Sequence, residues 1–186
     1  MFIVKPNNET FRIPRENTPK EIDLGCGTRK RAFGIDLKLP ADLIYDLRDG
    51  IPFEPDTIDI IYAYDFLEHL SDPIFIMKEI WRVLIDGGKL DFMVPSTDGK
   101  GAFQDPRHRS YWNINSIDYW ISDNSLADDI RGPCLFKTKC ESILPATIPG
   151  DITRGINYVK GNLFAVKTVE WLNTYRLRNP QDFIWI

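Results

Sequence analysis

Histidine and cysteine are scarce in this chain of 186 residues, which contains 2 histidines and 3 cysteines. The cysteines are Cys26, Cys134 and Cys140, and they show neither a CxxC spacing nor a neighbouring pair of histidines. This spacing predicts free thiols rather than a zinc site or a disulfide framework. We therefore expect no metal ion and a reducing, cytoplasmic location.

Long hydrophobic runs and an excess of basic charge are also lacking. No apolar stretch approaches the roughly 20 residues that a membrane helix needs, and the first residues lack the pattern of a signal peptide. The formal net charge is -4, which argues against binding to a nucleic-acid backbone, although residues 107–109 form one local basic cluster. We expect no membrane partner and no nucleic acid.

What is present fits one globular domain, with 43% hydrophobic and 27% charged residues. Residues 1–19 hold three prolines and polar clusters, which predicts a loose or edge-strand extension before a single domain over residues 20–186. From residue 20 onward, short apolar runs alternate with polar loops, as in an α/β fold with a mostly parallel sheet. The predicted strands are 21–24, 32–37, 43–47, 58–64 and 90–94, and the nearly continuous apolar residues of 58–64 predict a strand covered on both faces.

One helix is well marked between the last two of these strands. Asp72 is suited to the N-cap and Pro73 to the first helical position. Ile74, Met77, Trp81 and Leu84 recur at helical spacing and predict the buried face, and Gly87 is placed as the C-terminal stop.

Residues 96–112 carry no periodic apolar pattern, which predicts a functional loop with few core contacts. A short helix capped by Asn115 or Ser116 should follow this loop. Two later runs, 134–140 and 163–169, predict strands that pair in antiparallel fashion.

Polar or glycine residues follow four of the predicted strands. The segment Asp23-Leu24-Gly25-Cys26-Gly27 leads a strand into a Gly-x-Gly turn, where the missing Cβ atoms let a ligand approach the backbone. Asp36, Asp46 and Tyr64 stand at the ends of the next three strands. In a doubly wound sheet these ends share one edge, where ligands bind. Glycines also mark ordinary turns, so that reading of Gly25 and Gly27 stays open.

With these sequence motifs, the chain resembles the class I S-adenosylmethionine-dependent methyltransferases of the type 11 group. The resemblance runs from about Lys20 to Ser96, with a looser match at Asp105 to Trp112. It is carried by IDLGCG, GIDL, YDL, FEPDTIDIIYAYDFLEHL, IWRVLIDGGKLDFMVP and DPRHRSYW. It implies a Rossmann-like methyltransferase fold, with a doubly wound, mostly parallel sheet and a C-terminal antiparallel strand.

The resemblance also implies S-adenosyl-L-methionine as the cofactor and gives roles to residues of this chain. Asp23, Gly25 and Gly27 shape the methionine and ribose end of the pocket, together with the adjoining Leu24 and Cys26. Asp36 holds the ribose, with Leu37 beside it. Asp46 and Leu47 contact the adenine, and Tyr64 lies near the cofactor.

One departure from the usual nucleotide fold stands out. Asp36 follows the glycine turn much sooner than the usual spacing of about 20 residues. Residues 28–31 are too few for a crossover helix, so a loop must cover this side of the cofactor. The Gly-x-x-Gly continuation of a nicotinamide-binding word is also missing after Gly27, and Asp72-Pro73 is explained by helix capping.

The chemistry of the cofactor leaves a proton to be removed if the acceptor is a hydroxyl or a protonated amine. The candidate bases are His108, His69, Asp65 and Tyr111, although a structural role for His69 and an inert surface role for His108 stay open.

With no substrate-recognition domain in sight, we expect a small molecule or a sugar as the acceptor. Two alternatives are a methyltransferase-like module that binds the cofactor and serves as a partner subunit, and another nucleotide-sugar or nicotinamide enzyme on the same sheet. The oligomeric state cannot be read from the sequence.

Overall fold

The computed structural model describes residues 2–3, 12–121, 125–145, 155–168 and 170–172. Its eight-stranded sheet has the order β1-β4-β3-β2-β5-β6-β8-β7. Neighbours from β1 to β6 pair in parallel, and β8 pairs antiparallel with both β6 and β7.

The strands are β1 (Phe2–Ile3), β2 (Glu21–Leu24), β3 (Phe33–Asp36), β4 (Leu43–Ile44), β5 (Ile58–Tyr64), β6 (Leu84–Pro95), β7 (Leu135–Pro145) and β8 (Asn157–Val166). The helices are η1 (Arg15–Asn17), η2 (Leu47–Asp49), η3 (Leu67–His69), α1 (Pro73–Val83), α2 (Gly101–Gln104), α3 (Ile114–Ile121) and α4 (Ser125–Arg131).

The strand order reverses between β2 and β5. From β2 the chain proceeds outward through β3 to β4, and from β5 it proceeds the other way to β6. This reversal confirms the expected Rossmann-like, doubly wound arrangement, and it places a topological switch point at the carboxyl ends of β2 and β5. The antiparallel pairing of β7 with β8 confirms the predicted C-terminal hairpin.

The predicted strands differ from the observed ones mainly in length. β2 and β5 have the predicted bounds, and β3 is shorter by one residue at each end. β4 covers only Leu43–Ile44, because Asp46 caps the 3-10 helix η2 through a hydrogen bond from the Arg48 amide. β6, β7 and β8 are longer than predicted, since each gains residues by pairing with a distant strand.

Helix α1 begins as predicted. The Asp72 carboxylate accepts a hydrogen bond from the amide of Phe75, and Pro73 occupies the first turn. The predicted face is confirmed in part: Met77 and Leu84 are buried and Trp81 packs against the core, whereas the side chain of Ile74 is 39% exposed. The helix also buries three residues that were not predicted, namely Ile76, Ile80 and Val83.

The end of α1 is also earlier than predicted. Leu84 is extended and pairs with Ile58, so the chain passes directly from the helix into β6. Gly87, at φ +73°, is therefore not the helix stop. It lies in a bulge of β6, where the register shifts between the pairs Ile58–Leu84 and Ile60–Lys89.

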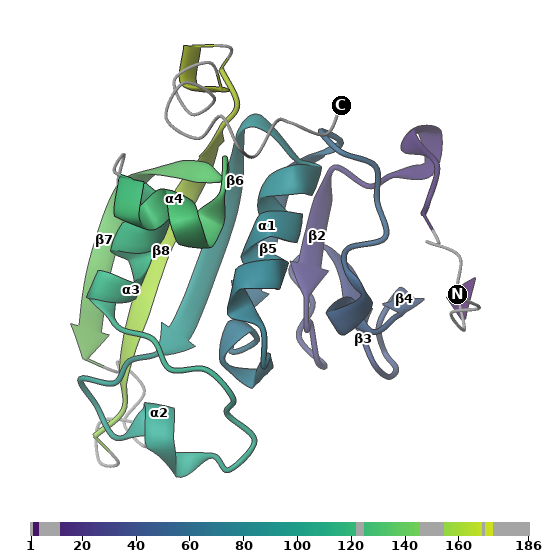
Figure 1. Ribbon diagram of the computed structural model, residues 1–186. Coiled ribbons are helices and arrows are strands. Elements are labelled where there is room, and N and C mark those ends of the chain that lie inside the picture. Colours follow the sequence, from purple (N-terminus) through teal and green to yellow (C-terminus); the bar gives the residue numbers. More distant parts are fainter. Residues whose placement is uncertain (1, 4–11, 122–124, 146–154, 169, 173–186) are drawn as a thin grey trace.

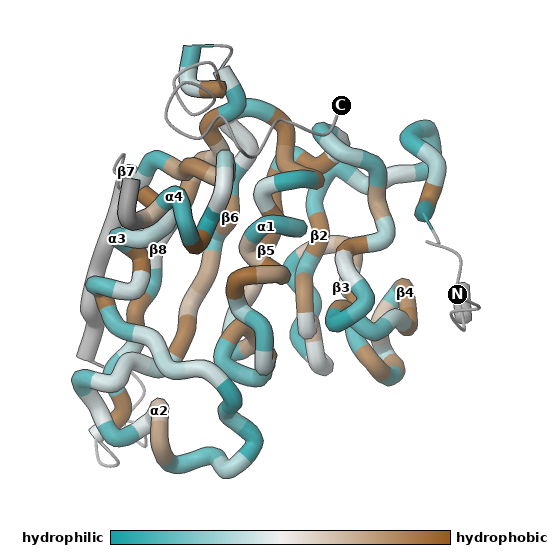
Figure 2. The backbone as a smooth tube through the Cα atoms, viewed as in Figure 1, coloured by the Kyte–Doolittle hydropathy of each residue, from teal (hydrophilic) through white to brown (hydrophobic). Residues whose placement is uncertain are grey.

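The helices α1, α3 and α4 lie on one face of the sheet (Figure 1). Their apolar side chains join those of the strands in one core cluster, and Figure 2 shows that many residues of β2 and β5 are hydrophobic. On β5 the burial alternates: Ile61 and Ala63 are buried, whereas Tyr62 and Tyr64 are partly exposed. The prediction that this strand is covered on both faces is therefore wrong for the described part of the chain.

Three further segments bear on the predictions. No helix forms between β2 and β3, as residues 28–31 predicted. Helix α3 is capped by Asn113, whose side chain accepts from the Ser116 amide, rather than by Asn115 or Ser116. In the N-terminal extension, Phe2–Ile3 pairs with β4 and Ile13 bridges to Phe53.

The described helices include none long and apolar enough to cross a bilayer. Cys26 and Cys134 are buried free thiols, as predicted. The side chain of Cys140 lies outside the described residues.

Candidate functional site

The glycine turn after β2 needs glycine at its first position. Gly25 has φ +62°, and a Cβ atom there would lie 2.4 Å from the ring of Phe66. Gly27 has φ +54°, but no atom lies within 4 Å of its Cβ position. The turn is therefore packed at Gly25 and open at Gly27, and the open side faces a pocket.

The Asp36 side chain is hydrogen-bonded to this turn. Its Oδ2 accepts a hydrogen bond of 3.0 Å from the Gly27 amide, and its carboxylate lines the same pocket. The prediction that the ends of β2 and β3 meet at one site is thereby supported, because the second acid stands directly beside the second glycine.

Asp23 has a different surrounding. It is 1% exposed, and its Oδ2 accepts a hydrogen bond of 2.8 Å from the amide of Arg31. Burial raises the pKa of this carboxyl, and the Arg31 amide and guanidinium lower it in part. Asp23 thus holds the short segment 28–31 against β2, in the place where a crossover helix would lie.

The side chain of Tyr64 contacts that of Arg31. Its hydroxyl donates to Asp91, and the guanidinium of Arg31 lies 3.8 Å above its ring centroid. Burial and the Asp91 carboxylate raise its pKa well above the usual range. The Tyr64 side chain thus contacts the 28–31 segment and does not line either pocket, so the structure does not support its predicted place beside the cofactor.

A pocket of about 550 Å³ lies at the switch point, within the range of small-molecule sites. Its lining comes from the ends of β2, β3, β4 and β5, and from the loop after β6. The lining residues are Gly25, Gly27, Asp36, Leu37, Lys38, Tyr45, Asp46, Leu47, Arg48, Asp65, Phe66, His69, Leu70 and Arg107. Six of the predicted cofactor residues are thus brought together: Gly25, Gly27, Asp36, Leu37, Asp46 and Leu47. The other four do not line the pocket: Leu24 and Cys26 are buried, and Asp23 and Tyr64 contact the segment 28–31 instead.

At the far end of this pocket, Asp46 is paired with Arg48. The Arg48 side chain bonds both carboxylate oxygens of Asp46, which lowers the pKa of that carboxyl. Leu47 is 5% exposed and Leu37 63% exposed, so one forms a floor and the other a rim.

A second pocket, of about 640 Å³, adjoins the first under the loop 96–112. The lining residues are Asp65, Glu68, His69, Pro95, Gly101, Gln104, Asp105, Pro106, Arg107, His108, Ile156 and Tyr158. Asp65, His69 and Arg107 line both pockets. Asp65 has φ +49°, a left-handed conformation that is uncommon outside glycine. The two hollows therefore share one wall.

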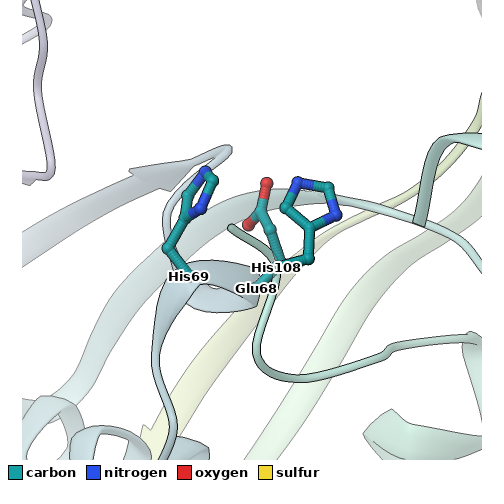
Figure 3. Close-up of side chains that lie close together, drawn as sticks. All are labelled: Glu68, His69 and His108. Atoms are coloured by element: carbon teal, nitrogen blue, oxygen red, sulfur yellow. The ribbon is translucent and has the colours of Figure 1, made fainter. Parts of the chain in front are cut away.

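Glu68, His69 and His108 meet in the second pocket. The two imidazole rings lie edge to face with centroids 5.0 Å apart, and Figure 3 shows the Glu68 carboxylate between them. Nδ1 of His108 lies 2.9 Å from the carbonyl oxygen of Ala102. Because a carbonyl can only accept, Nδ1 carries the proton, and Nε2 is left as an acceptor in the neutral ring.

The electrostatics of this cluster differ from those of its neighbours. Glu68 is 2% exposed, and burial raises its pKa to about 8. Burial and the nearby His108 lower the pKa of His69, while a hydrogen bond to the Arg107 backbone opposes this. At the rim, Arg107 holds the pKa of Asp105 well below its usual range.

The loop over the second pocket is better anchored than the sequence predicted. Its amides at Arg109 and Ser110 donate to the Glu68 carbonyl, and Ala102 and Trp112 are buried. The expectation of few core contacts is therefore wrong, because hydrogen bonds from Arg109 and Ser110 tie the loop to η3 and Trp112 belongs to the core cluster. The loop is nevertheless mainly hydrophilic (Figure 2).

The four candidate bases are distributed unevenly. His108, His69 and Asp65 line the second pocket, whereas Tyr111 is 54% exposed and stacks on Phe103 at 5.3 Å. Glu68 and Arg107 received no role from sequence reasoning, although both stand beside a histidine that did. Their part in the site becomes visible only in the folded chain, where Glu68 and His69 lie beside Arg107 and His108 although the two pairs are about forty positions apart in sequence.

Residues 22–92 match the family model of the methyltransferase domain. No curated protein matches the chain in sequence.

Several solved structures share the fold. A methyltransferase from Haloferax volcanii in complex with the Trm112 methyltransferase activator has a TM-score of 0.58 and 15% identity, over 81% of this chain and 83% of that one. The 1,6-didemethyltoxoflavin-N1-methyltransferase of Burkholderia thailandensis, with bound S-adenosylhomocysteine, has a TM-score of 0.54 and 11% identity, over 79% and 71%. A Listeria monocytogenes protein described as an S-adenosylmethionine-dependent methyltransferase has a TM-score of 0.53 and 16% identity, over 83% and 94%.

Proposed function

We propose that this chain, which carries the methyltransferase domain of the class I S-adenosylmethionine-dependent family, transfers a methyl group to a small acceptor held in the second pocket. The observation that carries this proposal is the shared wall. One pocket contains the glycine turn and Asp36, and the adjoining one contains the polar cluster at His108.

The residues at the switch point fit S-adenosylmethionine. The open Cβ position at Gly27 leaves the backbone free for close approach, and the Asp36 carboxylate can accept hydrogen bonds from ribose hydroxyls. Leu47 supplies an apolar floor for the adenine, with Asp46 at its edge. When bound, the cofactor supplies a methyl group made electrophilic by its sulfonium.

The chain's own task is then to align the acceptor and to handle its proton. Asp65, His69 and Arg107 stand between the two hollows, so they meet both ligands. His108 faces the acceptor side, fixed in orientation by Ala102. The loop 96–112 covers this side and limits the access of water, which favours transfer to the acceptor.

A small molecule or a sugar fits the second pocket, of about 640 Å³, by size. The alternative is a module that binds the cofactor and acts as a partner subunit; the relative from Haloferax volcanii is itself in a complex with an activator.

The proposal is tested by calorimetry and by methyl transfer. S-adenosylhomocysteine should bind and, at 100 times its dissociation constant, stabilise the fold by about 2.7 kcal/mol. Labelled S-adenosylmethionine should then pass its methyl group to a member of a small-molecule and sugar panel. Binding without turnover on any acceptor would favour the module, and absence of binding by the folded protein would refute both.

A further inference from the structure

The cluster of Glu68, His69 and His108 has the composition of a metal site. Each residue offers one ligand atom, and these three atoms lie within 4.8 Å of one another. In a tetrahedral zinc site with bonds of about 2.1 Å, two ligand atoms lie about 3.4 Å apart, so rotations of the side chains that bring these atoms closer by up to about 1.4 Å would close the site. One carboxylate with two imidazoles is a known catalytic donor set, which leaves positions open for water or substrate.

A second observation points to a ligand at the same place. Glu68 is 2% exposed, yet its Oε2 has no hydrogen-bond partner among the described residues. A buried carboxylate oxygen without a partner is costly. Because Figure 3 shows this carboxylate between the two rings, a cation held there would satisfy it.

The outer contacts also suit metal ligation. Histidines that bind metals usually donate their other ring nitrogen to a carbonyl or a carboxylate, which fixes the ring and its tautomer. His108 does this through Ala102, so its Nε2 is left to bind an ion.

We propose that Glu68, His69 and His108 bind a divalent transition-metal ion, such as Zn²⁺ or Co²⁺, in the second pocket. This revises the expectation of no metal, which rested on the spacing of the cysteines and on the lack of a pair of histidines near them. The ion binds independently of any acceptor, but its use in catalysis rests on the proposed function.

In that use the open positions of the ion take the acceptor through an oxygen, which favours a hydroxyl acceptor over an amine. The ion stabilises the deprotonated oxygen, and the proton leaves to water. The oxygen lone pair then forms the bond to the methyl carbon, while the carbon–sulfur bond breaks and its electron pair stays on sulfur. The products are a methyl ether and S-adenosylhomocysteine.

The test uses the full chain without a histidine tag, freed of metal by a chelator and titrated with Co²⁺. We expect one ion per chain, with a visible absorption band and no thiolate charge-transfer band. The chain has only 2 histidines, so histidine-selective nuclear magnetic resonance with Zn²⁺ should shift both imidazole signals.

Two variants and a control make the result specific. Glu68→Gln and His108→Ala should each weaken Co²⁺ binding by more than the roughly 10- to 100-fold that loss of an outer-shell partner costs. The control Asp98→Asn changes a carboxylate of the same loop that bonds Ser96, and it should keep the wild-type affinity. Circular dichroism verifies that each variant is folded.

Failure is distinguishable from failure of the methyltransferase proposal. If S-adenosylhomocysteine binds but Co²⁺ does not, or if Co²⁺ binds equally to the Glu68→Gln and His108→Ala variants, the metal site is refuted and the proposed function stands. A thiolate band would place the ion at a cysteine and would also refute the site. If Co²⁺ binds as expected and S-adenosylhomocysteine does not, the site stands without the methyltransferase.

Discussion

The Asp36 carboxylate accepts a hydrogen bond from the Gly27 amide at 3.0 Å, so the end of β3 and the glycine turn after β2 form one unit. The same carboxylate lines the pocket, where its second oxygen can meet a ribose. The loss of a hydrogen bond to a charged group costs about 1.5–3 kcal/mol.

Asp36→Ala should therefore weaken S-adenosylhomocysteine binding at least tenfold, as measured by calorimetry. The control is Asp59→Ala, which removes an acid that is paired with Lys20 and absent from the lining of either pocket. Equal affinity in Asp36→Ala and the control would mean that the ribose does not bind at β3.

The two glycines of the turn should respond differently to alanine. Gly25→Ala places a Cβ against Phe66 in a left-handed conformation, so overpacking and backbone strain should destabilise the fold by about 1–3 kcal/mol. Gly27→Ala meets no atom and should cost only the backbone strain of about 1–2 kcal/mol, while its methyl group obstructs the ligand. Urea unfolding separates the two, and equal unfolding midpoints would contradict the packing at Phe66.

The short segment between β2 and β3 should carry a pH-dependent share of stability. Asp42 accepts hydrogen bonds from Lys30 Nζ at 2.7 Å and from the Gly34 amide at 2.8 Å, which lower the pKa of its carboxyl below the ordinary 3.8. A depressed folded-state pKa stabilises the fold above pH 3.8, and this stabilisation is lost as the pH falls through the lower value.

Asp42→Asn should thus lower the free energy of unfolding at pH 7 by about 0.5–1 kcal/mol, a figure kept small because the pair is partly exposed to solvent. The difference between wild type and variant should shrink below pH 3.8. A difference that is the same at pH 7 and pH 3 would mean that the charge of Asp42 contributes nothing.

His108 and Tyr111 lie in the same loop but should differ in effect. His108 lines the second pocket, where we propose that the acceptor binds. His108→Ala should lower turnover by roughly 10²–10⁴-fold, whether His108 takes the proton itself or holds the ion that promotes its loss, and should spare cofactor binding. Tyr111→Phe retains the ring that stacks on Phe103 and should have near-normal turnover. A large loss in Tyr111→Phe would return the hydroxyl to the list of bases.

Local patterns predicted those parts of the fold that local interactions decide. The cap at Asp72 and the strand 58–64 depend on neighbouring residues, and both are found where expected. The end of α1 was misplaced, because Leu84 becomes extended by pairing with Ile58, a partner distant in sequence.

The candidate site shows the same division. The glycine turn and Asp36 were found, because each ends a strand and the strand ends of a doubly wound sheet converge. The part played by Glu68 could not be found in this way. It depends on His108, which lies beyond α1 and β6 in the sequence and which the loop 96–112 brings back to η3, and no periodicity encodes that return.

Asp65, His69 and Arg107 line both pockets, so they can couple the binding of one ligand to that of the other. A molecule in one pocket that shifted any of these side chains would change the surroundings of the other pocket as well. By linkage, whatever factor the cofactor product applies to acceptor affinity, the acceptor must apply to the affinity of the cofactor product. The order in which the two bind would then be a preference with a measurable coupling free energy, located in three side chains.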